Sequence, residues 1–227
     1  MSAHRYSRAE LDAVYRVIDE RRDMRHFQPD PVDPEVLARL LRAAHHAPSV
    51  GYMQPWRFVR VTDPGLRQSI GATVEAERVR TAEALGERGE EFMRLKVEGI
   101  HECGELLVVG LCSGRDHHIF GRRTLPEMDL ASAACAIQNL WLAARAEGLG
   151  MGWVSLFDPA DLARLLAMPA DARPIAILCL GHVDAFYDQP MLEREHWAQR
   201  LALTDLVSAD RWPESTTDRC GSTTDDG

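Results

Sequence analysis

The sequence lacks the motifs on which several large enzyme classes depend. It has no GxGxxG turn and no GxxxxGK[ST] loop, so neither a Rossmann dinucleotide site nor a P-loop is expected. It has no nucleophile elbow, and it offers no Cys–His pairing that would indicate nucleophilic catalysis. The adjacent pairs His45–His46 and His117–His118 direct their side chains apart and lack an HExxH motif or a cysteine partner, so we expect no metal site.

Cysteines and long apolar runs are also scarce. The 5 cysteines are scattered, odd in number and without CxxC spacing. Cys112, Cys135 and Cys179 lie in apolar runs, so we expect them to be buried thiols in a reducing compartment. No apolar run approaches the ~20 residues of a membrane span, and no signal peptide is visible. These features predict a cytoplasmic protein without a membrane partner.

Positive charge is in deficit over the whole chain. The net charge of −9 disfavours nucleic acid as a partner, and an anionic ligand would need a local cluster of arginines. A length of 227 residues and a hydrophobic content of 45% fit one domain with a substantial core. We expect that domain to span residues 1–208. The polar residues 209–227 are expected to be disordered.

The apolar periodicity indicates helices and strands in alternation. Helices are expected from Ser7 to about Glu20, from Asp33 to before Pro48, within residues 66–100, over Met128–Glu147 and after Asp158. Strands are expected over residues 57–62, 106–112, 151–157 and 174–181. This order predicts an α+β or α/β sandwich around one central sheet. The helix over 128–147 is apolar on nearly every face, which indicates burial in a core or at a subunit interface.

Three arginines are clustered in RRDMR, at Arg21, Arg22 and Arg25, where the first helix is expected to end. On an acidic chain they form a local anion site, because guanidinium groups bind phosphate in a bidentate way. The alternative is that they cap the helix C-terminus, whose partial negative charge attracts cations. The motif alone leaves both interpretations open.

Two further segments combine glycine with polar side chains. In APSVGYMQPW, Gly51 permits close approach of a ligand and Gln54 can donate and accept hydrogen bonds, as the edge of a planar heterocycle requires. In GMGWVS, two glycines precede Ser155, a hydroxyl in an otherwise apolar strand. The alternatives are a structural turn in the first case and a buried serine bonded to backbone in the second.

Together and in this order, the three segments resemble the flavin-dependent nitroreductase family. Its members carry an Arg-rich motif for the FMN phosphate, a PSxxxxQPW loop and a buried QNLxLAAxxxGLG helix, which match residues 21–25, 48–56 and 138–150 here. The resemblance covers about residues 10–207. It implies an α+β three-layer sandwich with a central, mostly antiparallel sheet, a domain-swapped C-terminal arm, and a homodimer that binds FMN at its interface.

The sequence is more similar still to one branch of the family, the 5,6-dimethylbenzimidazole synthases, which destroy their flavin. The segments HHAPSVGYMQPWRF and LCLGHVDAFYDQPML carry this resemblance, and Asp23 stands where ordinary nitroreductases have a small hydroxyl residue. A carboxylate beside a phosphate costs binding energy, so we expect Asp23 to face the ring and ribityl chain and to transfer protons. His26 and Phe27 depart from the family pattern at the exit of the motif.

The resemblance implies a set of site residues and a reaction. Asp23 and Ser155 would be catalytic. The residues that would contact FMN are Arg21, Arg22, Asp23, Met24, Arg25, Pro48, Ser49, Gly51, Met53, Gln54 and Arg200. Reduced FMN would be the substrate and dioxygen the co-substrate, and the products would be 5,6-dimethylbenzimidazole, the lower ligand of vitamin B12, and erythrose 4-phosphate. A separate flavin reductase would supply reduced FMN, and the charged segment near residues 75–100 would form a lid.

Two other functions stay open at this point. One is an NAD(P)H-dependent FMN nitroreductase or flavin reductase with the same fold. The other is a non-catalytic FMN-binding protein.

Overall fold

The structure is a computed structural model that describes residues 4–212. The chain divides into two compact units, Met1–Phe186 and Tyr187–Gly227, so the domain boundary predicted at residue 208 falls inside the second unit. Most of the predicted tail, residues 213–227, lies outside the described residues. Residues 209–212 contain no helix or strand. Within the described range, no helix combines the length and the apolar character needed to cross a bilayer.

The first unit is built on an antiparallel sheet. Among its described residues the strand order is β1 (Trp56–Arg60), β2 (Glu105–Leu111), β4 (Arg173–Gly181) and β3 (Gly150–Val154), and each neighbouring pair is antiparallel. The predicted central antiparallel sheet is therefore confirmed. The prediction that Ser155 lies inside a strand is wrong, because β3 ends at Val154 and Ser155 is exposed just after it.

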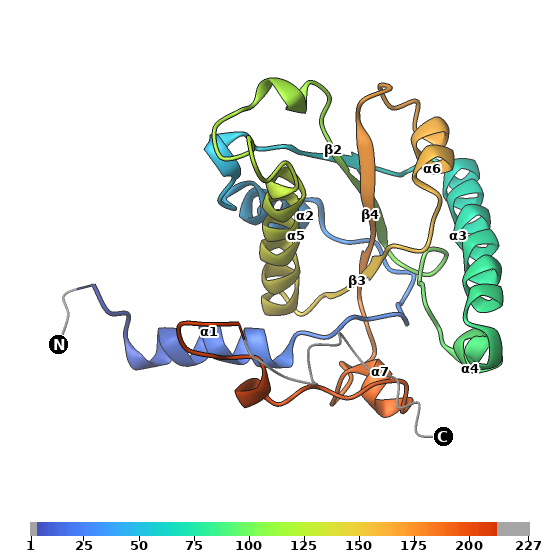
Figure 1. Cartoon of the computed structure of the whole chain (residues 1–227). Helices are drawn as coiled ribbons and strands as arrows, with labels where there is room; N and C mark the ends of the chain where they lie inside the picture. The colour runs from blue at the N-terminus through green and yellow to red at the C-terminus, as the bar shows by residue number, and fades with distance from the viewer. Residues whose placement is uncertain (1–3, 213–227) are drawn as a thin grey trace. The chain divides into compact units, whose positions relative to one another are not determined.

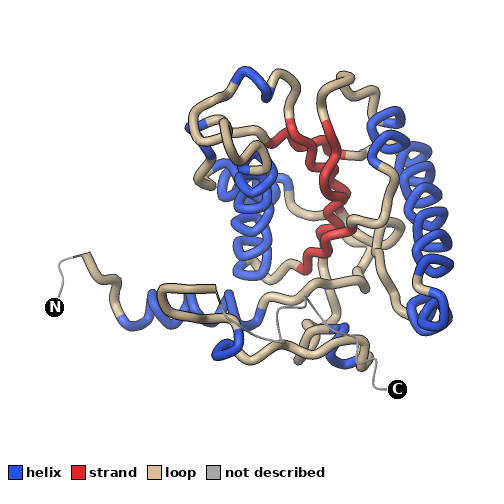
Figure 2. Tube along the Cα trace, in the orientation of Figure 1, coloured by secondary structure: helices blue, strands red, loops and turns tan. Residues whose placement is uncertain are grey.

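Helices cover both faces of this sheet (Figures 1 and 2). One face carries α2 (Pro34–His45) and α5 (Met128–Ala146), and the other carries α3 (Pro64–Ala84) and α6 (Pro159–Leu165). The predicted three-layer α+β sandwich is therefore confirmed.

Successive side chains of the central strands point to opposite faces of the sheet and pack into two separate cores. On β2, Leu107 and Val109 pack in the core on the α5 side, and Leu106 and Val108 pack in the core on the α3 side. This alternation follows from the period of two along a strand. Fully buried side chains fill both cores; Leu140 of α5, for example, is 0% exposed.

The predicted helix starts are confirmed by their caps. In α1 (Arg8–Glu20), Ser7 and Glu10 form the reciprocal capping box, and α2 is capped by the Asp33 side chain with Pro at its start. The charged segment forms α3 and α4 (Gly89–Arg94), as expected, but its ion pairs lie mainly at i,i+3 spacing. Among its described residues the second unit contains one short α-helix, α7 (Met191–Arg194), and a 3-10 turn over Leu203–Asp205.

Helix α5 is buried on one side and exposed on the other. Ile137 and Leu140 are 0% exposed, whereas Leu130 is 42% exposed. Cys135 is also exposed, so the prediction that it is buried is wrong, while Cys179 is buried as expected. Cys135 lies on the side of the helix that the single chain leaves uncovered, which an apolar run alone does not reveal.

Candidate active site

The segment after α1 runs beside β3 and is bonded to it. The backbone N–H of Met24 donates to the carbonyl oxygen of Met151 at 2.9 Å, and Asp23 and Met151 form an isolated parallel bridge. The backbone N–H of Trp153 donates to Asp23 Oδ1 at 3.0 Å. The carboxylate is thus fixed at the free edge of β3.

Arg25 completes the setting of this carboxylate. Its Nη2 donates to Asp23 Oδ2 at 2.7 Å and to the carbonyl oxygen of Trp153 at 2.9 Å, and the residue is 7% exposed. Gly152 provides the space, since a Cβ built there would lie 2.6 Å from Arg25 Nη1 and closer still to the Met24 carbonyl oxygen. The two glycines of the GMGWVS segment, Gly150 and Gly152, therefore allow the arginine-rich segment to pack closely against β3.

Burial outweighs the positive charges around Asp23. Desolvation raises the pKa of the Asp23 carboxyl above its ordinary value, although Arg25, the Trp153 N–H and Arg21 act in the opposite direction. In the single chain 42% of the side-chain surface is accessible, yet protein atoms surround the carboxyl closely enough for desolvation to prevail. A carboxyl with a raised pKa in a cationic segment is a typical mark of a functional site.

The remaining residues of the arginine-rich segment have distinct environments. Arg22 Nη1 donates to the carbonyl oxygens of Asp19 and Arg21 at 2.6 and 2.9 Å, so it caps the end of α1. The Arg21 guanidinium lies 4.5 Å from the centroid of the Trp141 ring. Met24 is 1% exposed as a residue and its backbone N–H is bonded to Met151, so it contributes to the core.

The loop over Pro48–Gln54 has an unusual backbone. Its 3-10 turn, Val50–Tyr52, contains Gly51 at φ 51°, and Tyr52 and Gln54 have φ values of 56° and 49°. Left-handed backbone costs energy for residues with a Cβ and tends to occur at functional sites. The Ser49 Oγ accepts from the backbone N–H of Gln54 at 3.0 Å, which stabilises this conformation.

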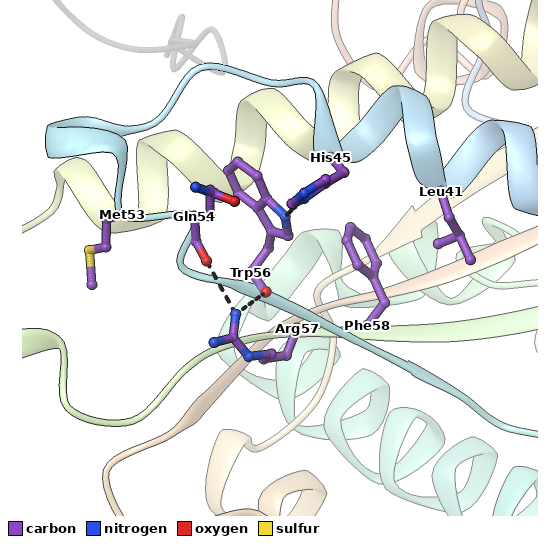
Figure 3. A pocket seen from close by; sticks show the side chains of 7 residues that line it. All are labelled: Leu41, His45, Met53, Gln54, Trp56, Arg57 and Phe58. Carbon is purple, nitrogen blue, oxygen red and sulfur yellow. Dashed lines mark hydrogen bonds between the residues drawn. The ribbon is translucent and has the colours of Figure 1, made fainter.

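A pocket of about 500 Å³ opens beside this loop, a volume typical of small-molecule sites. Figure 3 shows the side chains that line it, which are Leu41, His45, Met53, Gln54, Trp56, Arg57 and Phe58. Two of these, Met53 and Gln54, were predicted to contact a flavin ring. Arg57 turns back to the carbonyl oxygens of Gln54 and Trp56, at 3.2 and 2.7 Å (Figure 3).

His45 and Trp56 belong to this pocket and were not predicted from the sequence. Their rings meet edge to face at 6.1 Å, and Trp56 Nε1 donates to His45 Nδ1 at 3.4 Å. The sequence predicts only that His45 and His46 do not form a metal site, and it assigns His45 no other role. The feature of the sequence that could have indicated this pair is the tryptophan of the QPW triplet, which lies eleven positions after His45.

The structure does not gather all the predicted residues at one point of a single chain. Helix α5 holds the Pro48–Gln54 loop through a bond from Val50 N–H to Ser132 Oγ, and it holds the arginine-rich segment through a bond from Trp141 Nε1 to the Arg22 carbonyl oxygen. These two anchors are separated by about 13 Å along the helix. Arg200 belongs to the second unit, where it pairs with Glu193 at 3.8 Å.

The chain belongs to the nitroreductase family, whose model matches residues 18–182. A 5,6-dimethylbenzimidazole synthase of Rhodospirillum rubrum is 44% identical over 84% of this chain and 90% of its own length. A second protein of that name, from Rhodobacter capsulatus, is 40% identical over 86% of this chain and 96% of its own length. Among solved structures, iodotyrosine deiodinase bound to FMN and 3-iodo-L-tyrosine has a TM-score of 0.65 and 25% identity, and the match covers 78% of this chain and 92% of that one.

Proposed function

We propose that this chain catalyses the oxygen-dependent fragmentation of reduced FMN to 5,6-dimethylbenzimidazole and erythrose 4-phosphate. The observation that carries the proposal is Asp23, a carboxylate within an arginine-rich segment, fixed to β3 by the Trp153 N–H and by Arg25. The two relatives named 5,6-dimethylbenzimidazole synthase, at 40% and 44% identity over most of the chain, support it.

The residues present fit FMN at both ends of the molecule. Arg21, Arg22 and Arg25 supply positive charge for a phosphate. The polar atoms of the Ser49–Gln54 loop, including Gln54 at the pocket, suit the edge of the flavin ring. When bound, FMN supplies the redox chemistry and the reactivity toward dioxygen.

In this proposal Asp23 moves the protons. Its raised pKa brings the protonated and ionised forms closer in energy near neutral pH, which favours both acceptance and release of a proton. Arg25 orients the carboxylate by its bond to Oδ2. Ser155 follows β3 directly and orients the reacting ribityl chain through its hydroxyl.

We further propose a homodimer in which each flavin contacts both chains. Helix α1 has no buried residue and exposes Val14, Tyr15 and Ile18, and α5 exposes Leu130, so the single chain leaves apolar surface that a second copy would cover. A two-chain site would also bring the arginine-rich segment of one copy to the Pro48–Gln54 loop of the other. The C-terminal arm with Arg200 would extend over the partner. A separate cytoplasmic flavin reductase would supply reduced FMN.

The direct test is product analysis. Incubating the protein with chemically reduced FMN in air should consume the flavin and yield 5,6-dimethylbenzimidazole and erythrose 4-phosphate, detected by mass spectrometry. The same mixture without dioxygen should leave the flavin whole. Recovery of all the flavin as intact oxidised FMN from the aerobic mixture would contradict the proposal and favour a protein that binds flavin without destroying it.

A nitroreductase or flavin reductase is the second candidate, favoured by the family match and by a pocket large enough for a second substrate. It would reduce a nitroaromatic compound rapidly with NADH and FMN in the absence of dioxygen. The proposed synthase should not do so.

Replacing Ser155 by alanine is expected to lower the rate of benzimidazole formation by about 5- to 10²-fold, because a buried ribityl hydroxyl left without its hydrogen-bond partner costs about 1–3 kcal/mol. Affinity for FMN should change little, because the phosphate and ring contacts lie elsewhere. Single-turnover kinetics with reduced FMN in air would measure this. Ser69→Ala is the matched control, since Ser69 is exposed on α3 and its Oγ bonds within its own helix, to the Gly65 carbonyl oxygen. Equal rates for the two variants would remove Ser155 from the mechanism.

A further inference from the structure

A buried carboxylate stands in the first turn of α5, outside the residues assigned so far. Asp129 is 6% exposed. Its Oδ2 accepts from Arg115 Nε at 2.9 Å and from Arg122 Nη2 at 3.1 Å, and its Oδ1 accepts from the Leu130 N–H at 2.6 Å. Arg122 is itself 7% exposed. Arg115 is partly buried. Charged groups that are withdrawn from water in this way must be held in fixed geometry, because each unpaired charge would be costly.

The two arginines tie one long loop to this carboxylate. The loop, residues 114–127, has a single 3-10 turn, Arg115–His117, as its regular structure. Arg122 Nε donates to the Pro126 carbonyl oxygen at 3.2 Å, and Arg115 Nη1 donates to the carbonyl oxygen of Asp171 at 2.9 Å. Asp129 is thus the common anchor of both ends of the loop.

The anchored loop rests directly on the Ser49–Gln54 loop. A Cβ built at Gly51 would lie 2.9 Å from the Phe120 carbonyl oxygen and 3.4 Å from its ring. In return, a Cβ built at Gly121 would lie 2.5 Å from Val50 Cγ2. Each loop therefore uses a glycine where the other approaches, so a shift of one loop displaces the other.

This contact also leaves aromatic surface beside Gly51. Phe120 is 81% exposed and Tyr52 is 84% exposed. Apolar side chains that gather at one place on the surface, unlike scattered single ones, mark a site that a ligand or another chain covers. Here the proposed ligand of the adjoining loop is the flavin ring.

We infer that Asp129 is a positioning residue for flavin fragmentation. Through Arg115 and Arg122 it fixes the 114–127 loop on the Ser49–Gln54 loop, and so it keeps the Gly51 backbone and the Phe120 ring in place against the flavin. This inference rests on the proposed function. Asp129 does not touch the reacting atoms. Its effect passes through the two loops.

The test compares Asp129→Asn, Phe120→Ala and the control Asp161→Asn in the full-length protein. Asp129→Asn is expected to lower kcat for benzimidazole formation by about 10- to 10²-fold, as displacement of a reacting group by about 1 Å does. The dissociation constant for FMN should change far less, because the arginine-rich segment is untouched. Asp161 pairs with Arg164 at the surface of α6, so the same substitution there should leave kcat unchanged.

Phe120→Ala separates positioning from folding. The side chain is exposed, so its removal should not change the unfolding midpoint, yet kcat should fall as in Asp129→Asn. If Asp129→Asn does not fold, this variant decides. A Phe120→Ala protein with the kcat of the parent would overturn the inference.

A second measurement makes the two failures distinguishable. If the parent makes no benzimidazole, the proposed function fails, and positioning is then read from the visible circular dichroism of bound oxidised FMN and from hydrogen exchange. Asp129→Asn should change the dichroism and accelerate exchange in both loops, and Asp161→Asn should change neither. Unchanged spectra and exchange in Asp129→Asn would overturn the inference.

Discussion

Replacing Asp23 by asparagine is expected to lower the rate of benzimidazole formation by about 10²- to 10⁴-fold, the usual contribution of one proton-transferring group, while FMN still binds. Asparagine keeps an oxygen to accept the Trp153 N–H, so the segment should stay on β3. What is lost is the ability to exchange a proton. The rate is measured by rapid mixing of the protein, loaded with reduced FMN, with aerated buffer, followed by quantification of the products. Equilibrium dialysis measures the affinity for FMN.

The stability of the same variant separates chemistry from folding. A carboxyl whose pKa is raised by folding stabilises the folded state when protonated, and that contribution is present below the unfolded-state pKa and lost as pH rises through the folded-state pKa. At a pH above the folded-state pKa the parent therefore carries the cost of an ionised, buried Asp23 carboxylate, and asparagine removes that cost. The Tm of Asp23→Asn at pH 7 should equal or exceed that of the parent, and the gap should close on acidification below the ordinary aspartate range.

Asp30→Asn is the matched control, seven positions along the chain at an exposed residue. It should retain both the rate and the Tm of the parent. A markedly lower Tm for Asp23→Asn would show that the carboxylate serves the fold, and full activity would remove it from the mechanism.

Replacing Gly152 by alanine is expected to damage the fold and the site together. The added methyl group would lie 2.6 Å from Arg25 Nη1 and 3.5 Å from Asp23 Oδ1, and it would overlap the Met24 carbonyl oxygen. The backbone cannot yield there without breaking the Met24–Met151 bond, so the Asp23–Arg25 segment must leave β3. Overpacking of this kind costs about 1–3 kcal/mol.

Urea unfolding and product analysis together test this expectation. The unfolding midpoint should fall, and benzimidazole formation should fall further than in Ser155→Ala because both Asp23 and Arg25 are displaced. Gly65→Ala serves as the control, since its methyl group meets the Asp63 side chain at 3.2 Å in the first turn of α3. A Gly152→Ala protein with parental stability and rate would mean that the segment is not held as described.

The features that the sequence predicts well are those with local causes. The Ser7–Glu10 capping box and the Asp33 cap depend on hydrogen bonds between residues at most three positions apart, so the local sequence is enough to predict them. The continuous apolar run over residues 106–112 likewise predicts a strand buried on both faces, and β2 does lie between two layers of helices.

The features that escape prediction depend on partners far away in sequence. Arg25 interacts with Trp153 across 128 positions, and no local pattern indicates that this arginine is buried beside Asp23. Cys135 is exposed because of the side of α5 on which it falls. Ser155 lies beyond β3 because that strand ends at Val154, before the end of the strand predicted over residues 151–157. Residue types at these positions are compatible with several environments, and tertiary packing selects one.

The bond between Asp23 and Trp153 joins residues 130 positions apart, and this separation orders events during synthesis. A ribosome adding about 5–20 residues each second needs roughly 7–26 s to pass from one to the other. Until β3 has emerged, the arginine-rich segment has no strand edge to hold its carboxylate. A nascent chain can therefore expose the arginines proposed to bind phosphate before it can hold the carboxylate proposed to move protons, so the proposed flavin fragmentation must wait until β3 has emerged.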